Sequence, residues 1–129
     1  MILSGSEGYS LTELNRPKDW NNLEVMDKKH VPMVEAPDRT KSGEPFEVQL
    51  KVGGIDGVEH PNALSHHIAW VELHAGERHV GRIDFAPVVS NGYKVRISLS
   101  LEKSTTLRAR AFCNLHGLWE GNTKAIAVK

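Results

Sequence analysis

The sequence predicts an all-β fold, and its strand pattern is typical of a β-sandwich. Three observations predict this class. Several short stretches alternate apolar and polar residues with a period of two, turn-forming residues separate these stretches, and no long helical period is present. A chain of 129 residues fits one domain with a core of its own.

The alternation predicts six strands, at residues 46–52, 66–73, 79–85, 95–101, 107–113 and 125–128. Glycine-rich residues 53–57 end the first strand, and residues 74–77 form the turn after the second. Ser90-Asn91-Gly92 indicates a hairpin turn, because Asn-Gly readily adopts positive φ. We expect residues 125–128 to close the chain as an edge strand.

The strand at residues 107–113 places a thiol on the buried face of the sheet. Leu107, Ala109 and Ala111 alternate with two arginines, and a further step of two reaches Cys113. Cys113 is the only cysteine, so an internal disulfide and a Cys-x-x-Cys metal knot are both excluded.

Charge and composition exclude several other classes. The chain has 16 Lys and Arg against 16 Asp and Glu, so its formal charge of zero does not predict binding to nucleic acid or to an anionic membrane. No apolar stretch approaches the length of a membrane span, and residues 1–8 lack the features of a signal peptide. We therefore expect a cytoplasmic protein, in which the single thiol stays reduced.

The chain divides at about residue 26. Residues 1–26 show no clear periodicity, so we expect either an N-terminal arm across a neighbouring subunit or a partly disordered extension. Residues 27–129 hold the predicted strands and form the expected metal-binding sandwich domain.

Candidate metal ligands lie in three short segments. His30 stands in Lys29-His30-Val31-Pro32, His60 and His66 lie in the run at residues 60–67, and Cys113 lies close to His116. Imidazole suits iron, copper and zinc, and a thiolate adds a soft, strongly donating ligand. The set predicts a mononuclear transition-metal site with redox chemistry. His67 directly follows His66, so on a strand it faces the opposite side and is not included.

These segments, read in order as Lys-His-Val-Pro, His-Pro-Asn-x-x-x-His-His-Ile-x-Trp and Cys-Asn-x-His-Gly-x-Trp, resemble the superoxide reductases. That family includes neelaredoxin and the catalytic domain of desulfoferrodoxin. The resemblance runs from about Asp27 to the C-terminus. It implies an immunoglobulin-like sandwich of about seven strands. It also implies one iron that cycles between Fe²⁺ and Fe³⁺ and reduces superoxide to hydrogen peroxide.

The resemblance also assigns roles to residues. The implied iron ligands are His30, His60, His66 and His116 in a plane, with Cys113 on the axis opposite an open position for superoxide. Lys29 is implied to attract superoxide and to deliver protons through water. A rubredoxin-like electron donor and a homotetramer are implied as well. One position departs from the family pattern, because Lys28 stands where the family usually has a glutamate that caps ferric iron.

Two other functions remain open from the residues alone. A blue-copper-like electron carrier is also a sandwich with an early His and a late Cys and His, but here no methionine follows His116 to serve as its weak axial ligand. An interaction module with a degraded metal site is the other alternative. The complete set of five ligands argues against it.

Overall fold

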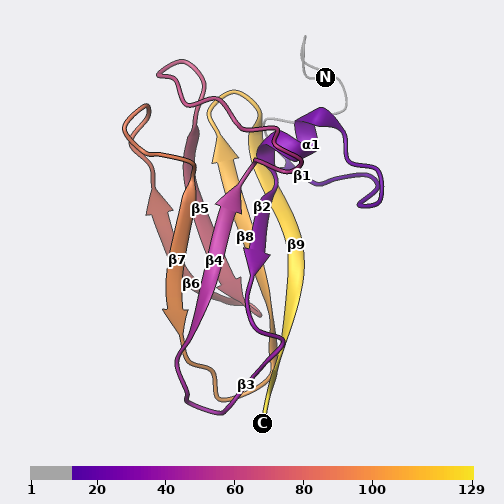
Figure 1. The fold of residues 1–129 in the computed structure, drawn as a ribbon, viewed down its shortest axis with the longest axis vertical. Helices are drawn as coiled ribbons and strands as arrows, with labels where there is room; N and C mark the ends of the chain where they lie inside the picture. Colours follow the sequence, from indigo (N-terminus) through magenta and orange to yellow (C-terminus); the bar gives the residue numbers. More distant parts are fainter. Residues whose placement is uncertain (1–12) are drawn as a thin grey trace.

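Strand alternation gives this chain two β-sheets that face each other across an apolar core (Figure 1). The computed structural model describes residues 13–129. In chain order its elements are β1 (Leu14–Asn15), α1 (Val25–His30), β2 (Pro32–Glu35), β3 (Arg39–Thr40), β4 (Phe46–Val52), β5 (Ile68–Ala75), β6 (Arg78–Asp84), β7 (Lys94–Leu99), β8 (Thr105–Cys113) and β9 (Gly117–Val128).

The two sheets differ in size. The larger has the strand order β1-β9-β8-β5-β6, with β3 also pairing to β9, and the smaller has the order β2-β4-β7. The prediction of an all-β sandwich is confirmed. Of the nine strands in residues 13–129, seven have four or more residues, while β1 and β3 have two each.

The core forms where the alternating side chains of both sheets meet. Val48 and Leu50 from β4 are fully buried, and so are Leu107 and Ala109 from β8. Cys113 continues the buried face of β8 and has no exposed surface, as the alternation predicted. The apolar core therefore extends to the end of β8 and includes the thiol of Cys113.

Two expectations about strand connections are wrong. Ser90-Asn91-Gly92 does not form a hairpin turn, because β6 and β7 belong to different sheets and the segment between them crosses from one sheet to the other. Residues 125–128 are not an edge strand, because the C-terminal part of β9 pairs with β8 on one side and with β3 on the other.

Strands β2 and β9 approach closely enough to fix how the sheets meet. A Cβ on Gly121 would lie 1.6 Å from the carbonyl oxygen of Pro32, so only glycine fits this position of β9. The next residue, Asn122, accepts a hydrogen bond from Val34 N–H at 2.8 Å and donates one to the Val34 carbonyl at 3.3 Å. These contacts hold the start of β2, and with it the end of α1, against β9.

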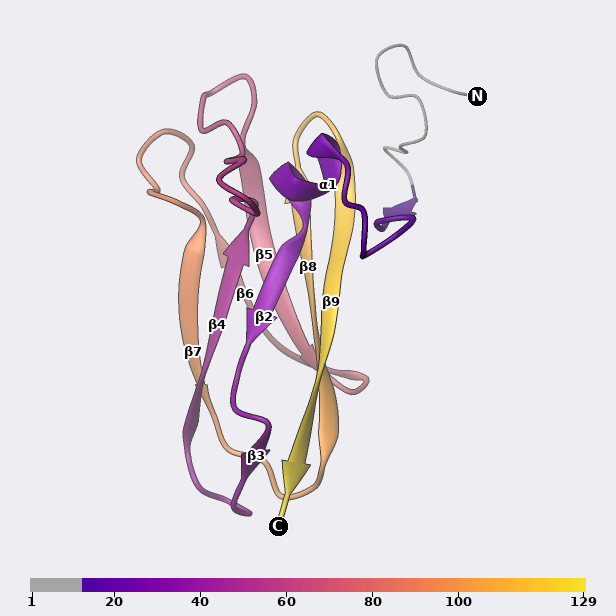
Figure 2. The same cartoon turned by 45° about the vertical axis from the view of Figure 1, so that its right-hand side comes forward.

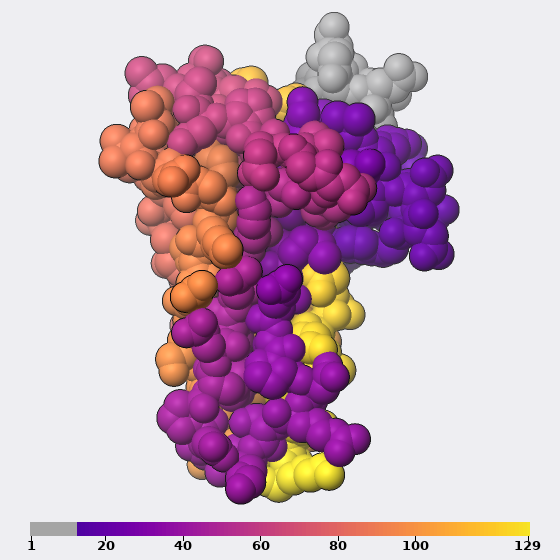
Figure 3. Space-filling model, viewed as in Figure 1, coloured from indigo at the N-terminus to yellow at the C-terminus, as the bar shows by residue number. Residues whose placement is uncertain are grey.

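Helix α1 and several interstrand loops gather at one end of the sandwich (Figures 1 and 2). The space-filling view shows that this end is broader than the opposite one (Figure 3). The six-residue α1 is the only helix in the described part of the chain, which contains no helix suited to crossing a bilayer.

The start of the chain is described only in part. Residues 1–12 of the expected arm lie outside the described residues. Leu14 and Asn15 pair with β9 of the same chain in parallel register, opposite Leu118 and Trp119. The division into an arm at 1–26 and a metal-binding domain at 27–129 stays a prediction.

Candidate metal centre

His30 is placed by the short helix α1, which the sequence did not predict. The helix begins after Glu24, whose backbone N–H donates to the carboxylate of Asp27 at 2.9 Å, as in a capping box. His30 is the last helical residue and is fully buried. Its ring stacks on Trp119, with centroids 4.7 Å apart and an interplanar angle of 16°.

Hydrogen bonding fixes the tautomer of His30. Its Nδ1 lies 2.8 Å from the carbonyl oxygen of Met26, and a carbonyl can only accept, so Nδ1 carries the proton. Nε2 is left as a lone pair, and this buried atom has no hydrogen-bond partner in the described part of the chain. A buried imidazole with an unsatisfied lone pair is what a metal ligand requires before the metal binds.

His60 is held in the same way by the loop after β4. Its Nδ1–H donates to the Pro61 carbonyl at 2.7 Å, and the Tyr93 hydroxyl donates to the same oxygen at 2.8 Å. Its Nε2 lies 3.3 Å from the sulfur of Cys113. The loop therefore points the Nε2 lone pair of His60 at the thiol.

His66 follows a tight turn in which Ala63 and His66 exchange two backbone hydrogen bonds, of 2.9 and 3.1 Å. Its Nε2 is buried and also lacks a hydrogen-bond partner within residues 13–129. The turn is tied to the Cys113 segment by Asn114, which accepts from His67 N–H at 2.8 Å and donates to the Ser65 carbonyl at 3.0 Å. Asn114 thus links the two loops that carry His66 and His116.

Cys113 and His116 flank the turn between β8 and β9. Gly117 has φ of +80°, which closes this turn with little strain. The backbone N–H of His116 donates to the Cys113 sulfur at 3.4 Å, and His116 Nδ1 lies 3.7 Å from that sulfur. Asn15 and Trp119 both donate to the His116 carbonyl, at 3.2 and 3.1 Å.

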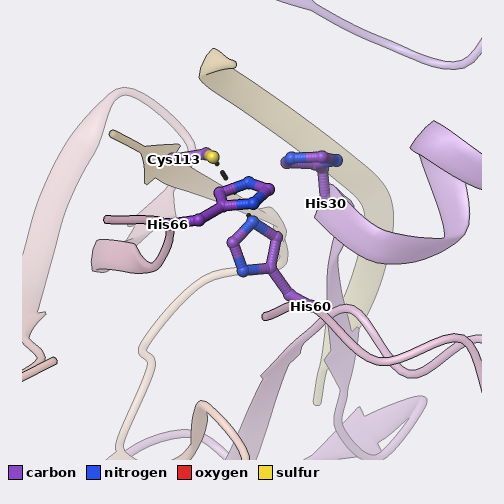
Figure 4. A group of neighbouring side chains, drawn as sticks. All are labelled: His30, His60, His66 and Cys113. Carbon is purple, nitrogen blue, oxygen red and sulfur yellow. Dashed lines mark hydrogen bonds between the residues drawn. The ribbon is translucent and has the colours of Figure 1, made fainter. Parts of the chain in front are cut away.

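Four of these side chains, those of His30, His60, His66 and Cys113, converge on one region (Figure 4). One ligand atom from each of His30, His60, His66 and Cys113 lies within 4.8 Å of the others. His116 is not part of this tight group, but its ring centroid lies 5.0 Å from that of His30 and 5.1 Å from that of His66. The fold thus brings together all five residues expected as ligands, from α1, two loops and the end of β8.

Burial keeps the imidazoles neutral. It lowers the pKa of His30 to about 3 and that of His60 to about 4, with neighbouring histidines adding to the shift. The pKa values of His66 and His116 are also lowered, first by burial. Neutral imidazoles have the lone pairs that a metal needs. Burial raises the pKa of the Cys113 thiol in the metal-free protein, whereas a bound cation would hold it as thiolate.

Two lysines at the end of α1 have different surroundings. Lys28, at the position of the family glutamate, forms an ion pair with Asp56 at 3.2 Å. Lys29 has no ion pair within residues 13–129, and its charge lowers the pKa values of His60, His66 and His116. Within residues 13–129, Lys29 is therefore the cation whose charge acts on these three imidazoles.

The acidic residues near α1 do not join the ligand group. Asp27 caps the helix, and within residues 13–129 the group holds only nitrogen and sulfur donors. Such a mixed set of imidazole and thiolate is typical of transition-metal sites and unlike those of calcium or magnesium. The residues present therefore fit a transition metal.

Some supporting residues could not be found from the sequence. Tyr93, Asn114 and Asn15 hold the ligand loops through hydrogen bonds to residues up to 101 positions away. Tyr93 is remote from the His60 loop in sequence and gave no signal. Asn114 directly follows Cys113, so its position within the third ligand segment was the one available signal.

A two-sheet β-sandwich with imidazole nitrogens and a thiol converging at one end is characteristic of a metal-binding protein. The family model described as desulfoferrodoxin matches residues 22–122, and the chain belongs to that family.

Individual relatives agree with this assignment. The chain is 35% identical over 109 residues to a putative superoxide reductase from Methanocaldococcus jannaschii, covering 83% of this chain and 88% of the relative. It is 30% identical over 137 residues to neelaredoxin from Megalodesulfovibrio gigas, covering 92% and 98%. Among solved structures, superoxide reductase (neelaredoxin) from Ignicoccus hospitalis matches with a TM-score of 0.75 and 35% identity, covering 90% and 95%.

Proposed function

We propose that this chain is a superoxide reductase, which combines superoxide with one electron and two protons to give hydrogen peroxide. Family membership and the named relatives support this activity. The observation that carries it is the convergence of buried histidine nitrogens on the Cys113 sulfur, with no hydrogen-bond partner among residues 13–129 for Nε2 of His30 or of His66. The proposed ligands are His30, His60, His66, His116 and Cys113, and the proposed metal is one iron.

Bound iron would supply the electron by passing between its ferrous and ferric states. The chain's own residues would prepare that chemistry. Met26 and Pro61 carbonyls hold the Nδ1 protons of His30 and His60, so their Nε2 atoms stay free to bind metal. Cys113 would add a strongly donating anionic sulfur, and the backbone N–H of His116 would temper its charge.

Lys29 is the proposed residue for attracting the substrate. Superoxide is an anion and the net charge of the chain is zero. Lys29, which has no ion pair within residues 13–129, places a positive charge near three of the imidazoles. Its ammonium group also carries protons that water can relay to the product. Lys28 contributes less, because Asp56 neutralises it.

The purified chain tests this proposal directly. We expect about one iron per chain, and we expect the ferrous protein to consume superoxide with formation of one peroxide per superoxide and no dioxygen. Evolution of dioxygen would indicate dismutation instead. Copper in place of iron would favour the electron carrier, and a chain that binds no metal would favour the interaction module.

We further propose a rubredoxin-like electron donor, a homotetramer and a cytoplasmic location, in which Cys113 stays reduced. Stopped-flow mixing of reduced rubredoxin with the ferric protein tests the donor. Light scattering coupled to size-exclusion chromatography tests the assembly. Slow reduction by rubredoxin would contradict the proposed donor. A measured mass of 14.3 kDa, that of a single chain, would contradict the homotetramer.

A further inference from the structure

The turn after β4, residues 53–58, lies against the end of α1 and next to His60. Gly53 N–H donates to the Val31 carbonyl at 3.2 Å, and Ile55 N–H donates to the Lys28 carbonyl at 3.4 Å. Lys28 also forms its ion pair with Asp56 of this turn. The turn therefore contacts the backbone on both sides of His30.

Gly53 makes the closest of these approaches. A Cβ at this position would lie 2.5 Å from the carbonyl oxygen of Lys29 and 3.3 Å from the backbone nitrogen of His60. Both atoms belong to the backbone, so neither can move aside as the end of a flexible side chain could. Lys29 directly precedes His30. Gly53 thus sits between the backbone segments that carry two of the proposed ligands.

We propose that Gly53 is a positioning residue for the metal centre, and that its missing side chain sets the spacing between His30 and His60. This inference rests on the proposed iron site. The rings of these two histidines lie 4.7 Å apart, and each is already held by a backbone carbonyl. A side chain at residue 53 must push the Lys29 backbone or the His60 backbone outward, and the attached ligand moves with it.

The chain offers matched controls, because other glycines share the backbone conformation of Gly53 without its contact. Gly53 has φ of +74°, Gly57 in the same turn has φ of +79°, and Gly43 has φ of +75°. A Cβ on Gly57 or Gly43 would meet nothing within 4 Å. Alanine at either control position therefore carries the strain of positive φ without the close approach.

The experiment measures release of ferrous iron to a chelator from the iron-loaded wild type, Gly53→Ala, Gly57→Ala and Gly43→Ala. We expect release at least about 10-fold faster in Gly53→Ala, as for other changes next to metal ligands. The two controls should match the wild type. Binding of Co²⁺ gives a second readout, and its visible absorption should shift in Gly53→Ala alone.

Two further measurements complete the test. Thermal unfolding of the metal-free variants should show that Gly53→Ala still folds cooperatively, with a larger loss of stability than Gly57→Ala because its Cβ adds the close contact to the strain of positive φ. Asp56→Asn removes the Lys28 ion pair, does not touch the core, and should speed iron release in the same direction but less.

Each contrary outcome has a distinct meaning. Unchanged release in both Gly53→Ala and Asp56→Asn would overturn the inference while leaving the iron site intact. Equally faster iron release in Gly53→Ala and Gly57→Ala would attribute the change to backbone strain. Failure of metal-free Gly53→Ala to fold would show that Gly53 is needed by the whole sandwich. Either result overturns a specific role at the site. Absence of iron in the wild type would instead contradict the proposed function.

Discussion

The two sides of the candidate metal centre are built differently. His30, His60 and Cys113 form an inner side, in which all three residues are buried and each imidazole donates to a backbone carbonyl. His66 and His116 form an outer side, in which both residues are only half-buried. Each outer residue lies near an exposed leucine in sequence, with Leu64 77% exposed and Leu115 46% exposed.

This difference indicates how the site divides its tasks. The inner side shares its atoms with the core, so its geometry is set by folding, before any metal is present. The outer side belongs to two loops that Asn114 ties together, and its two histidines are more exposed to solvent than those of the inner side. Folding thus sets the inner side through the core, and hydrogen bonds within and between the two loops hold the outer side.

The largest effect is expected from the inner sulfur. Cys113→Ser should abolish superoxide reduction, because a hydroxyl is a much poorer donor than a thiolate, while the nearly equal volume leaves the sandwich folded. Pulse radiolysis of the ferrous variant measures the activity. Ala111→Ser, which buries a hydroxyl two residues earlier on the same strand face, is the control for polar burial. Wild-type turnover in Cys113→Ser would refute the role given to this residue.

Removing one imidazole from each side tests the comparison itself. His30→Ala should lower the free energy of unfolding of the metal-free protein by about 2–4 kcal/mol, because it opens a cavity beside Trp119 and removes the hydrogen bond from the ring to the Met26 carbonyl. His116→Ala should cost less than about 1 kcal/mol, since its side chain is half-buried. Urea unfolding measures both values. Equal losses in the free energy of unfolding would contradict the proposed difference between the inner and outer sides.

Acid should destabilise the metal-free protein through the inner histidines. In the unfolded chain they take up protons below their usual pKa of 6.5, but in the folded protein only near pKa values of about 3 for His30 and 4 for His60. Since the unfolded state binds more protons in this range, stability falls as pH drops from about 6.5 towards about 3.

Urea unfolding at several pH values measures this slope. His30→Gln should reduce it by up to about 1.4 kcal/mol per pH unit, the contribution of one proton. A slope that is the same in wild type and in His30→Gln would show that His30 does not stay neutral on folding.

The smallest effect concerns the approach of superoxide to the outer side. Lys29→Ala should slow the bimolecular reaction by up to about 10-fold at low salt and flatten its dependence on ionic strength. Lys28→Ala is the matched control and should change the rate less, because Asp56 already neutralises Lys28. Pulse radiolysis measures this rate. A bimolecular rate that does not depend on salt in the wild type would contradict electrostatic steering of superoxide by Lys29.

Much of this protein follows from local patterns in the sequence. The period of two at residues 46–52 and 107–113 gave the two strands β4 and β8 in nearly their observed bounds, because half-buried strands alternate wherever one face meets the core. The same alternation placed Cys113 on the buried face. The ligand residues were visible as types, since few side chains other than His and Cys suit a transition metal.

Only the tertiary structure decided the rest, because the deciding contacts join residues far apart in the chain. Helix α1 is six residues long, too short for a helical period to appear. The Asn91-Gly92 signal describes a local turn but not which sheets its flanking strands join. Gly53 against Lys29 and Gly121 against Pro32 are close approaches between remote segments, and a sequence shows the glycine but not the backbone that requires it.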